Sequence, residues 1–138
     1  GGAQNHRIGL YDMVMLKDNH VDSAGGITAA VEKTRKFLSE QNLDLKIEVE
    51  TRNLDEVNEA LVNKVDRIMF DNFSIDLCKE AVKLVNKRAE TEASGGITRD
   101  SIREYALTGV QFISVGALTH SVSALDISFK TKIKARNL

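Results

Sequence analysis

The fold is decided by residues 46–94, which read KIEVETRNLDEVNEALVNKVDRIMFDNFSIDLCKEAVKLVNKRAETEAS. Short apolar runs at 45–49, 67–70 and 89–93 alternate here with two stretches whose apolar residues recur at helical spacing. The run at 89–93 is the least typical of a strand, because it contains two glutamates. This alternation predicts βαβ units with right-handed crossovers and a parallel sheet.

The same alternation continues on both sides of this stretch. Apolar runs at Met13–Leu16 and 111–115 predict one more strand before it and one after it. Apolar residues at 30–38 and at 102–106 share one helical face each, which predicts two further helices. The chain is therefore expected to hold about five strand–helix units.

Capping residues mark the ends of these helices. Asn53, Ser74 and Thr98 carry side-chain oxygens that suit helix N-caps, and each is followed within three residues by an acid. Asn63 and Gly109 stand where two of the helices should stop. The local signals thus agree with the hydrophobic pattern.

The spacing of the strands decides between a barrel and an open sheet. The predicted strands end at Glu50, Asp71, Ser94 and Gly116, at intervals of 21, 23 and 22 residues. Such short, regular units favour a (β/α) barrel, and the GxGxxG motif of dinucleotide-binding sheets is absent. A complete eight-unit barrel needs at least ~200 residues. We therefore expect residues 1–138 to be one α/β domain, the later part of a barrel whose first strands lie upstream.

The C-terminal segment has a different pattern. From 125 to 133, apolar residues or threonine alternate with polar residues, which predicts a strand with one solvated face. We expect this terminal strand at 125–133 to pair with something outside the barrel.

The composition argues against several classes of function. The 19 Lys and Arg residues nearly balance the 20 Asp and Glu residues, and aromatic residues make up only 5% of the chain, so nucleic-acid binding is not expected. No apolar run approaches the ~20 residues that span a bilayer, so no membrane partner is expected. A single cysteine can form neither an internal disulfide nor a Cys-based zinc site, which fits a cytoplasmic location.

Glycine loops follow the last two predicted strands. Ser94, Gly95 and Gly96 let the backbone approach an anion, and the helix expected after them directs its N–H groups to the same place. Gly116 repeats the arrangement one unit later, where many barrels bind a phosphate. The alternative is that these glycines only allow tight turns. A similar Gly-Gly-Ile-Thr at 25–28, after a longer loop, is interpreted as a helix start rather than a second phosphate site.

Charged residues also lie at the predicted strand ends, where barrels carry their functional groups. Glu50 and Asp71 end adjacent strands and could share a Mg²⁺ ion. The alternative is a salt-bridge network with Lys17. Lys17 follows four apolar residues, so its ammonium group should emerge at the barrel mouth beside an anionic ligand or a carboxylate. The basic pair His6 and Arg7 precedes the first strand and would by itself indicate a solvated surface.

Together these segments resemble one family, quinolinate phosphoribosyltransferase, the decarboxylating nicotinate-nucleotide pyrophosphorylase of NAD biosynthesis. The matching segments fall in the family's order and spacing over nearly the whole chain. They are 1–7 (GGAQNHR), 9–12 (GLYD), 17–20 (KDNH), 48–50 (EVE), 71–72 (DN), 92–97 (EASGGI), 114–121 (SVGALTHS) and 125–126 (LD).

The resemblance implies a reaction and an architecture. Quinolinate and phosphoribosyl pyrophosphate, with Mg²⁺, would give nicotinate mononucleotide, pyrophosphate and CO₂. The fold implied is an open (β/α) barrel of the type-II phosphoribosyltransferase kind behind a separate N-terminal domain. The assembly implied is a homodimer or higher homo-oligomer whose subunits share active sites.

The resemblance also implies roles for the residues singled out above. By position, His6, Arg7 and Lys17 resemble the residues that surround the quinolinate carboxylates. Glu50 and Asp71 resemble the acidic pair near the ribose hydroxyls and the metal, and with Lys17 they are the expected catalytic residues. The phosphate loops correspond to a set of small residues: Ser94, Gly95, Gly96 and Gly116.

Two features of the family lie outside this chain. Its Thr-Arg-Lys-Thr stretch, which supplies further cations, should precede Gly1, and so should the N-terminal domain with its inter-subunit arginine. Two classes of function stay open: part of a working phosphoribosyltransferase, or a non-catalytic partial barrel that binds a phosphorylated ligand or a partner chain. Within the enzyme class, a paralogue for another ring acid is the alternative, although Lys17, His6 and Arg7 favour quinolinate.

Overall fold

Five parallel strands form one curved sheet in the computed structural model, which describes residues 2–9, 11–121 and 124–131. The strands are β1 (Met13–Leu16), β2 (Lys46–Thr51), β3 (Arg67–Asp71), β4 (Glu90–Ser94) and β5 (Phe112–Ile113). Their order in the sheet is their order in the chain, and every neighbouring pair is parallel. The predicted βαβ pattern is confirmed. The last strand has two residues rather than the five expected at 111–115.

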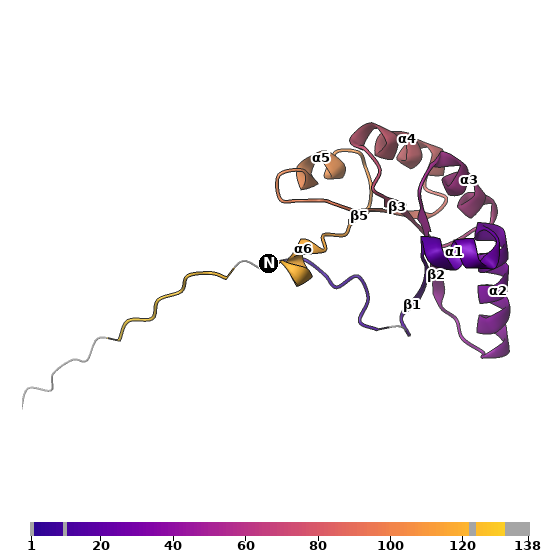
Figure 1. Ribbon diagram of the computed structural model, residues 1–138, viewed down its shortest axis with the longest axis horizontal. Helices are drawn as coiled ribbons and strands as arrows, with labels where there is room; N and C mark the ends of the chain where they lie inside the picture. The colour runs from indigo at the N-terminus through magenta and orange to yellow at the C-terminus, as the bar shows by residue number, and fades with distance from the viewer. Residues whose placement is uncertain (1, 10, 122–123, 132–138) are drawn as a thin grey trace, which may run out of the picture.

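Helices cover the outer, convex side of this sheet (Figure 1). They are α1 (Asp18–Ala24), α2 (Ile27–Glu40), α3 (Leu54–Val62), α4 (Ile75–Val85) and α5 (Ile102–Ala106). The short helix α6 (Ala117–His120) follows β5 and is not part of this outer layer (Figure 1). The segment before β1 crosses the inner, concave side instead (Figure 1). None of the helices in the described part of the chain is long and apolar enough to cross a membrane.

The predicted helix ends are mostly confirmed. The Asn53 side chain accepts a hydrogen bond from the Glu56 N–H at 2.9 Å, and Ser74 caps α4 in the same way. Thr98 was expected to begin a helix, but α5 starts only at Ile102. The Thr98 hydroxyl instead accepts from the Ser101 N–H at 3.4 Å, which forms a separate turn before the helix.

The sequence predicted a loop between the first strand and the glycine pair at 25–28. This prediction is wrong, because helix α1 occupies the stretch. Gly25 ends α1 in a left-handed conformation, with φ +94°, and Gly26 is the N-cap of α2. The interpretation of this glycine pair as a helix start is confirmed. As a result, α1 begins directly after Lys17, at the C-terminal end of β1.

The hydrophobic core lies between the helices and the outer face of the sheet. Alternate residues of the strands point to this side, and Val49, Ile68 and Phe70 are fully buried there. Val57 of α3 and Cys78 of α4 are equally buried in the same cluster. Burying a side chain of this size stabilises the fold by about 1.5–3 kcal/mol, so this layer carries the stability of the domain.

The inner face of the sheet is polar instead. Glu48 of β2 is in register with Arg67 of β3, which is in register with Glu90 of β4. Glu92 follows two residues later on the same side and is fully buried. The two glutamates in the run at 89–93 are therefore compatible with a strand, because their side chains face the inside of the barrel rather than the apolar core.

The chain forms part of a barrel and not a closed one. Within the described residues, β1 and β5 each have a free edge. Residues 124–131 have no strand assignment and extend away from the barrel (Figure 1), with Leu125, Ile127 and Phe129 more than 80% exposed. The strand expected at 125–133 therefore has no partner among the described residues, and its last two positions lie outside them. Pairing outside the barrel stays a prediction.

Candidate functional site

The two glycine loops lie together at the C-terminal end of the sheet. Ser94, Gly95 and Gly96 follow β4, and Gly116 follows β5. With Ser114, Ile97, Thr98, Ala117 and His120 they line a pocket of about 410 Å³. The structure therefore brings together the residues that the sequence singled out as a phosphate site.

The first loop needs glycine for its shape. Gly95 and Gly96 have φ values of +95° and +58°, a region that disfavours side chains. A Cβ atom on Gly95 would also lie only 2.8 Å from the backbone nitrogen of Asn72. Among the described residues, no group accepts a hydrogen bond from the N–H of Gly95, Gly96 or Ile97. These donors are available to an anion.

The helix expected to add its N-terminus to this site does not do so. Because α5 starts at Ile102, the residues after the loop form the Thr98–Ser101 turn. The Thr98 N–H donates to the Ser101 hydroxyl at 3.0 Å, so it is already used within the turn. The phosphate-binding donors are therefore those of the loop itself.

Glu50 and Asp71 lie at the ends of neighbouring strands, as predicted. Burial raises the pKa of Glu50, and the negative charges of Asp71 and Asp18 raise it further. Lys17 and Arg52 act in the opposite direction. Two half-buried carboxylates at neighbouring strand ends are a donor set that suits a divalent cation, so these residues fit the Mg²⁺ that the family implies.

Asn72 connects these acids to the first glycine loop. Its side-chain amide donates to Asp71 Oδ2 at 2.8 Å, and its backbone N–H donates to the Ser94 carbonyl at 2.9 Å. Asn72 has φ +55°, a conformation that asparagine tolerates better than most residues. Sequence reasoning matched this residue to the family but gave it no role.

Lys17 lies at the mouth, in the N-cap position of α1, and is exposed. In the described part of the chain, no ion pair joins Lys17 to Glu50 or Asp71, so the salt-bridge alternative is not what the structure shows. Its charge nevertheless lowers the pKa of Glu50. Lys17 is therefore close to the acids and free to meet an anionic ligand.

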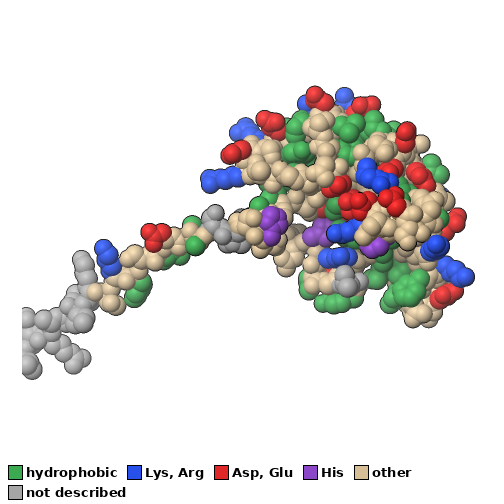
Figure 2. Space-filling model, in the orientation of Figure 1, with side chains coloured by type: hydrophobic (Ala, Val, Ile, Leu, Met, Phe, Trp, Pro, Cys, Tyr) green, Lys and Arg blue, Asp and Glu red, His purple; other side chains and the backbone are tan. Residues whose placement is uncertain are grey.

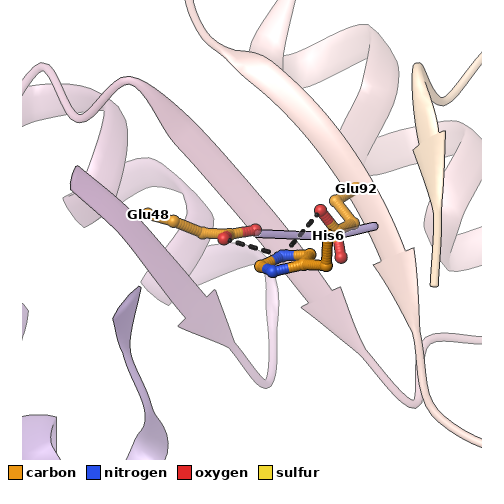
Figure 3. A group of neighbouring side chains, drawn as sticks. All are labelled: His6, Glu48 and Glu92. Carbon is orange, nitrogen blue, oxygen red and sulfur yellow. Dashed lines mark ion pairs between the residues drawn. The ribbon is translucent and has the colours of Figure 1, made fainter. Parts of the chain in front are cut away.

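His6 and Arg7 are not a solvated surface pair. His6 Nε2 lies 3.1 Å from Glu48 Oε2 and 3.3 Å from Glu92 Oε2, between the two acids (Figure 3). Arg7 donates from Nη1 to the Met13 carbonyl at 3.3 Å. The segment before β1 is thus held on the inner face of the sheet. In Figure 2, acidic side chains gather in the hollow of the viewed face, bordered by basic and histidine side chains.

Sequence reasoning matched Glu48 and Glu92 to the family but gave neither a role, and they form an acidic group on the inner face of the sheet. Glu48 and Glu92 are both fully buried. Burial and the neighbouring Glu92 raise the pKa of Glu48 to about 8, against the attraction of Arg67 and Arg7. Arg67 pairs with Glu90 and Glu92 and stacks on the Phe112 ring, with its guanidinium carbon 3.9 Å from the ring centroid. The signal was present, because charged residues occupy alternate positions of β2 (46, 48 and 50) and the same face of β3 (67 and 71) and β4 (90 and 92).

Comparisons with known proteins agree with this arrangement. The sequence matches the family described as Quinolinate phosphoribosyl transferase, C-terminal domain, over residues 1–130. It is 49% identical over 145 residues to the chloroplastic nicotinate-nucleotide pyrophosphorylase [carboxylating] of Arabidopsis thaliana, covering 94% of this chain and 42% of that protein. It is 44% identical to the probable nicotinate-nucleotide pyrophosphorylase [carboxylating] of Bacillus subtilis, covering 93% of this chain and 43% of that protein.

Solved structures show the same fold. The nicotinate-nucleotide pyrophosphorylase of Francisella tularensis superimposes with a TM-score of 0.84 at 48% identity, covering 93% of this chain and 44% of that one. The chain thus spans less than half the length of these relatives. A thiamine phosphate pyrophosphorylase of Pyrococcus furiosus, at 22% identity and a TM-score of 0.59, shares the fold alone. On the family match and this structural likeness, the chain belongs to the quinolinate phosphoribosyltransferase family, as the later part of its open (β/α) barrel.

Proposed function

We propose that this chain is part of a quinolinate phosphoribosyltransferase. The enzyme transfers the phosphoribosyl group of phosphoribosyl pyrophosphate to quinolinate and releases pyrophosphate and CO₂, leaving nicotinate mononucleotide. The observation that carries the proposal is the link through Asn72, which holds Asp71 with its side chain and the Ser94 carbonyl with its backbone N–H. Carboxylates that suit a metal therefore lie beside a loop that suits a phosphate, as a phosphorylated sugar diphosphate requires.

The glycine loops bind the phosphate of the ribose in this proposal. The N–H groups of Gly95, Gly96 and Ile97 are available donors, and Gly116 forms the opposite wall of the same pocket. A side chain on either loop would compete with the phosphate for this space. Backbone donors of this kind bind an anion without the loss of side-chain freedom that a lysine or arginine would bring.

Glu50 and Asp71 act on the sugar and its leaving group. Mg²⁺ held by these carboxylates would neutralise charge on the departing pyrophosphate. The same carboxylates can orient the ribose hydroxyls, and their negative charge stabilises the positive charge that develops at the ribose carbon as its bond to pyrophosphate breaks. Their place at the strand ends, next to the phosphate pocket, supports both roles.

Lys17, Arg7 and His6 bind the ring carboxylates. Lys17 is at the mouth and close enough to Glu50 to lower its pKa, so a substrate held by Lys17 lies near the acids. These cationic side chains would also stabilise the decarboxylation step, since loss of CO₂ leaves negative charge on the ring. The protonated ring nitrogen is the other group that can offset this charge.

The proposal also includes the assembly of the enzyme and the compartment in which it works. The free sheet edges within the described residues and the exposed apolar residues at 125–129 support a homo-oligomer with a further domain upstream. A single buried cysteine and a net charge of −1 support a reducing compartment such as the cytoplasm, and no nucleic-acid partner.

The test is an assay of the full-length protein with phosphoribosyl pyrophosphate, Mg²⁺ and quinolinate. Nicotinate mononucleotide and CO₂ are expected in equal amounts, measured by chromatography and by release of labelled CO₂. Nicotinate in place of quinolinate should give no product. Product from another ring acid but not from quinolinate would establish the paralogue instead, and no product with any ring acid would overturn the enzymatic function.

Lys17→Ala tests the ring side of the site. Charge-assisted hydrogen bonds to a carboxylate contribute roughly 1.5–3 kcal/mol, or about 10- to 150-fold in affinity. The KM for quinolinate should rise by that factor, and the KM for phosphoribosyl pyrophosphate should change less. Lys33→Ala, on the exposed face of α2, is the matched control and should change neither. Equal effects of Lys17→Ala on both substrates would count against its assignment.

A further inference from the structure

His6 reaches the inside of the barrel from the segment before β1, and two strands hold it there. Glu48 of β2 and Glu92 of β4 approach the same ring nitrogen, Nε2, from opposite sides (Figure 3). Both acids are fully buried, whereas the His6 side chain is 25% exposed. The imidazole therefore stands between buried negative charge and the open hollow of the barrel.

The two glutamates differ in their other partners. Glu92 is satisfied without His6, because Arg67 donates to its Oε2 at 3.2 Å and the Ser114 hydroxyl donates to its Oε1. Among the described residues, neither oxygen of Glu48 accepts a hydrogen bond of good geometry, and its close polar contact is with His6 Nε2, at 3.1 Å. A buried carboxylate without a partner is costly, so Glu48 depends on His6 more than Glu92 does.

These contacts determine how the imidazole is oriented. Nε2 lies 3.1 Å from one acid and 3.3 Å from the other, so this nitrogen is the point at which the two strands hold the ring. The geometry of the ring then directs Nδ1 away from both acids. Arg7, the next residue, is held on β1 through the Met13 carbonyl. The His6–Arg7 segment is thus anchored at two points on the inner face of the sheet.

The anchor lies at the level of the mouth. Glu48 precedes Glu50 by one inward-facing position on β2, and Glu92 is in register with Glu50 through Met69 of β3. A dicarboxylate bound near Glu50 would be repelled by two bare glutamates at this depth. His6 stands between these glutamates and the hollow, and Arg7 is the next residue in the chain, so the substrate would meet these two side chains rather than the acids.

We propose that Glu48 and Glu92 are positioning residues for quinolinate, which hold His6 by Nε2 so that its opposite edge and the neighbouring Arg7 face the ring carboxylates. This inference rests on the proposed function and deepens it. The two glutamates do not touch the substrate themselves. They act through His6, as partners of metal-bound or catalytic histidines commonly do.

A divalent cation is the other ligand that these three residues could hold, since their ligand atoms lie within 4.8 Å of one another. The Arg67 guanidinium argues against it, because it already donates to the same Glu92 oxygen that a metal would need. A dication next to this guanidinium would be repelled at close range. The histidine, rather than a metal ion, therefore links the two acids.

A double-mutant cycle in the full-length enzyme tests the inference. The dissociation constants of quinolinate and of phosphoribosyl pyrophosphate are measured by calorimetry for Glu92→Gln and Glu48→Met, in the His6 and in the His6→Ala background. Each substitution should weaken quinolinate binding by about tenfold in the His6 background and cause no further loss in the His6→Ala background. Phosphoribosyl pyrophosphate binding should change by less than about twofold.

Glu90→Gln is the matched control. Glu90 also pairs with Arg67, but its side chain is 30% exposed and it is not among the residues that contact His6. Its substitution should leave quinolinate binding unchanged. Thermal unfolding of each variant checks that the fold is intact, and Glu48→Met should be at least as stable as the parent, since it removes a buried carboxylate.

Each outcome decides the question. Equal losses in both backgrounds, or equal losses for both ligands, would show that the glutamates act on the fold and would overturn the inference. So would one equivalent of Zn²⁺ bound by the enzyme and lost in His6→Ala. If the parent enzyme makes nicotinate mononucleotide but Glu92→Gln and Glu48→Met bind quinolinate normally, the positioning role fails alone. If the parent enzyme is inactive with quinolinate, the proposed function fails.

Discussion

At the scale of single residues, Glu48 shows how far the inner face departs from an ordinary core. It has no exposed surface, yet it stands beside a second buried acid rather than among apolar side chains. Burial is the main reason why its pKa rises to about 8, and Glu92 adds to the effect. Near neutral pH the carboxyl therefore holds its proton for much of the time, and the cluster carries less negative charge than its composition suggests.

This pKa predicts a pH dependence of stability. The pKa of Glu48 is higher in the folded state, about 8, than the ordinary 4.5, so the folded state binds the proton more tightly. The stability from this proton is fully present below pH 4.5 and is lost as the pH rises through 8. Thermal unfolding between pH 5 and 9 should therefore show a steeper loss for the parent protein than for Glu48→Gln. Parallel curves would contradict this, and Glu80→Gln, exposed on α4, is the control.

Gly116 offers the cleaner test of the phosphate pocket. Gly96 has φ +58°, so any side chain there strains the backbone whether or not a phosphate binds. Gly116 has φ −59°, which all residues adopt, and an added Cβ would meet only the His120 ring, at 3.0 Å. Gly116→Val should weaken phosphoribosyl pyrophosphate binding by about tenfold or more with the fold intact.

The measurement is a titration of phosphoribosyl pyrophosphate by calorimetry, with circular dichroism as the check on folding. Ala106→Val, which adds bulk on the exposed side of α5, is the control and should bind as the parent does. An unchanged affinity of Gly116→Val for phosphoribosyl pyrophosphate would show that these glycines only allow tight turns.

At the scale of helices and strands, the pattern predicted from sequence holds where apolar residues face helices. Val49, Ile68 and Phe70 lie on the outer face, and their spacing is what made β2 and β3 recognisable. The hydrophobic pattern was weakest at β4, because Glu90 and Glu92 face the barrel interior. The alternation of apolar and polar residues along a strand does not indicate that its polar side can also be buried. Only the three-dimensional closeness of Arg67 and His6 explains those acids.

Helix α1 could not be predicted for a related reason. Its seven residues, DNHVDSA, bury Val21 alone, so no apolar stripe marks it. Gly25 ends the helix, and Arg52 after β2 ties it down by pairing with Asp22. The missed helix does not move the predicted site residues, because the C-terminal end of a barrel strand reaches the mouth whether a loop or a helix comes next.

The cap of α3 gives the prediction at this scale. Asn53 accepts from the Glu56 N–H, so Asn53→Ala should lower the free energy of unfolding by about 1 kcal/mol. Asn58→Ala makes the same chemical change on the exposed face of the same helix and should be neutral or slightly stabilising, since alanine favours helices. Denaturant midpoints at a constant slope measure both. Equal effects would show that the cap contributes nothing.

At the scale of the whole molecule, five strands in sequential order do not close a barrel. The free edges of β1 and β5 within the described residues, and the exposed apolar positions 125, 127 and 129, leave backbone and side chains that favour association. The relatives are more than twice as long as the matched region. The remaining strands and the partner of the terminal segment are expected from the rest of such a chain.

We therefore predict that residues 1–138 expressed alone are poorly soluble or molten and form no nicotinate mononucleotide. The full-length chain should be an active oligomer. Size-exclusion chromatography with light scattering, near-UV circular dichroism and the product assay measure this, with the full-length protein as the control. A monomeric, well-folded and active 138-residue chain would refute the prediction.

The division of the sheet into an apolar outer face and a charged inner face has a consequence for mutagenesis. Along β2, β3 and β4, neighbouring positions have different surroundings: one packs in the apolar core, and the next lies on the charged inner face. Substitutions at outward positions should then lower the stability of the fold, whereas substitutions at inward positions should change the polar cluster and leave the core intact. A saturation scan of these strands should accordingly separate abundance from activity with a repeat of two residues.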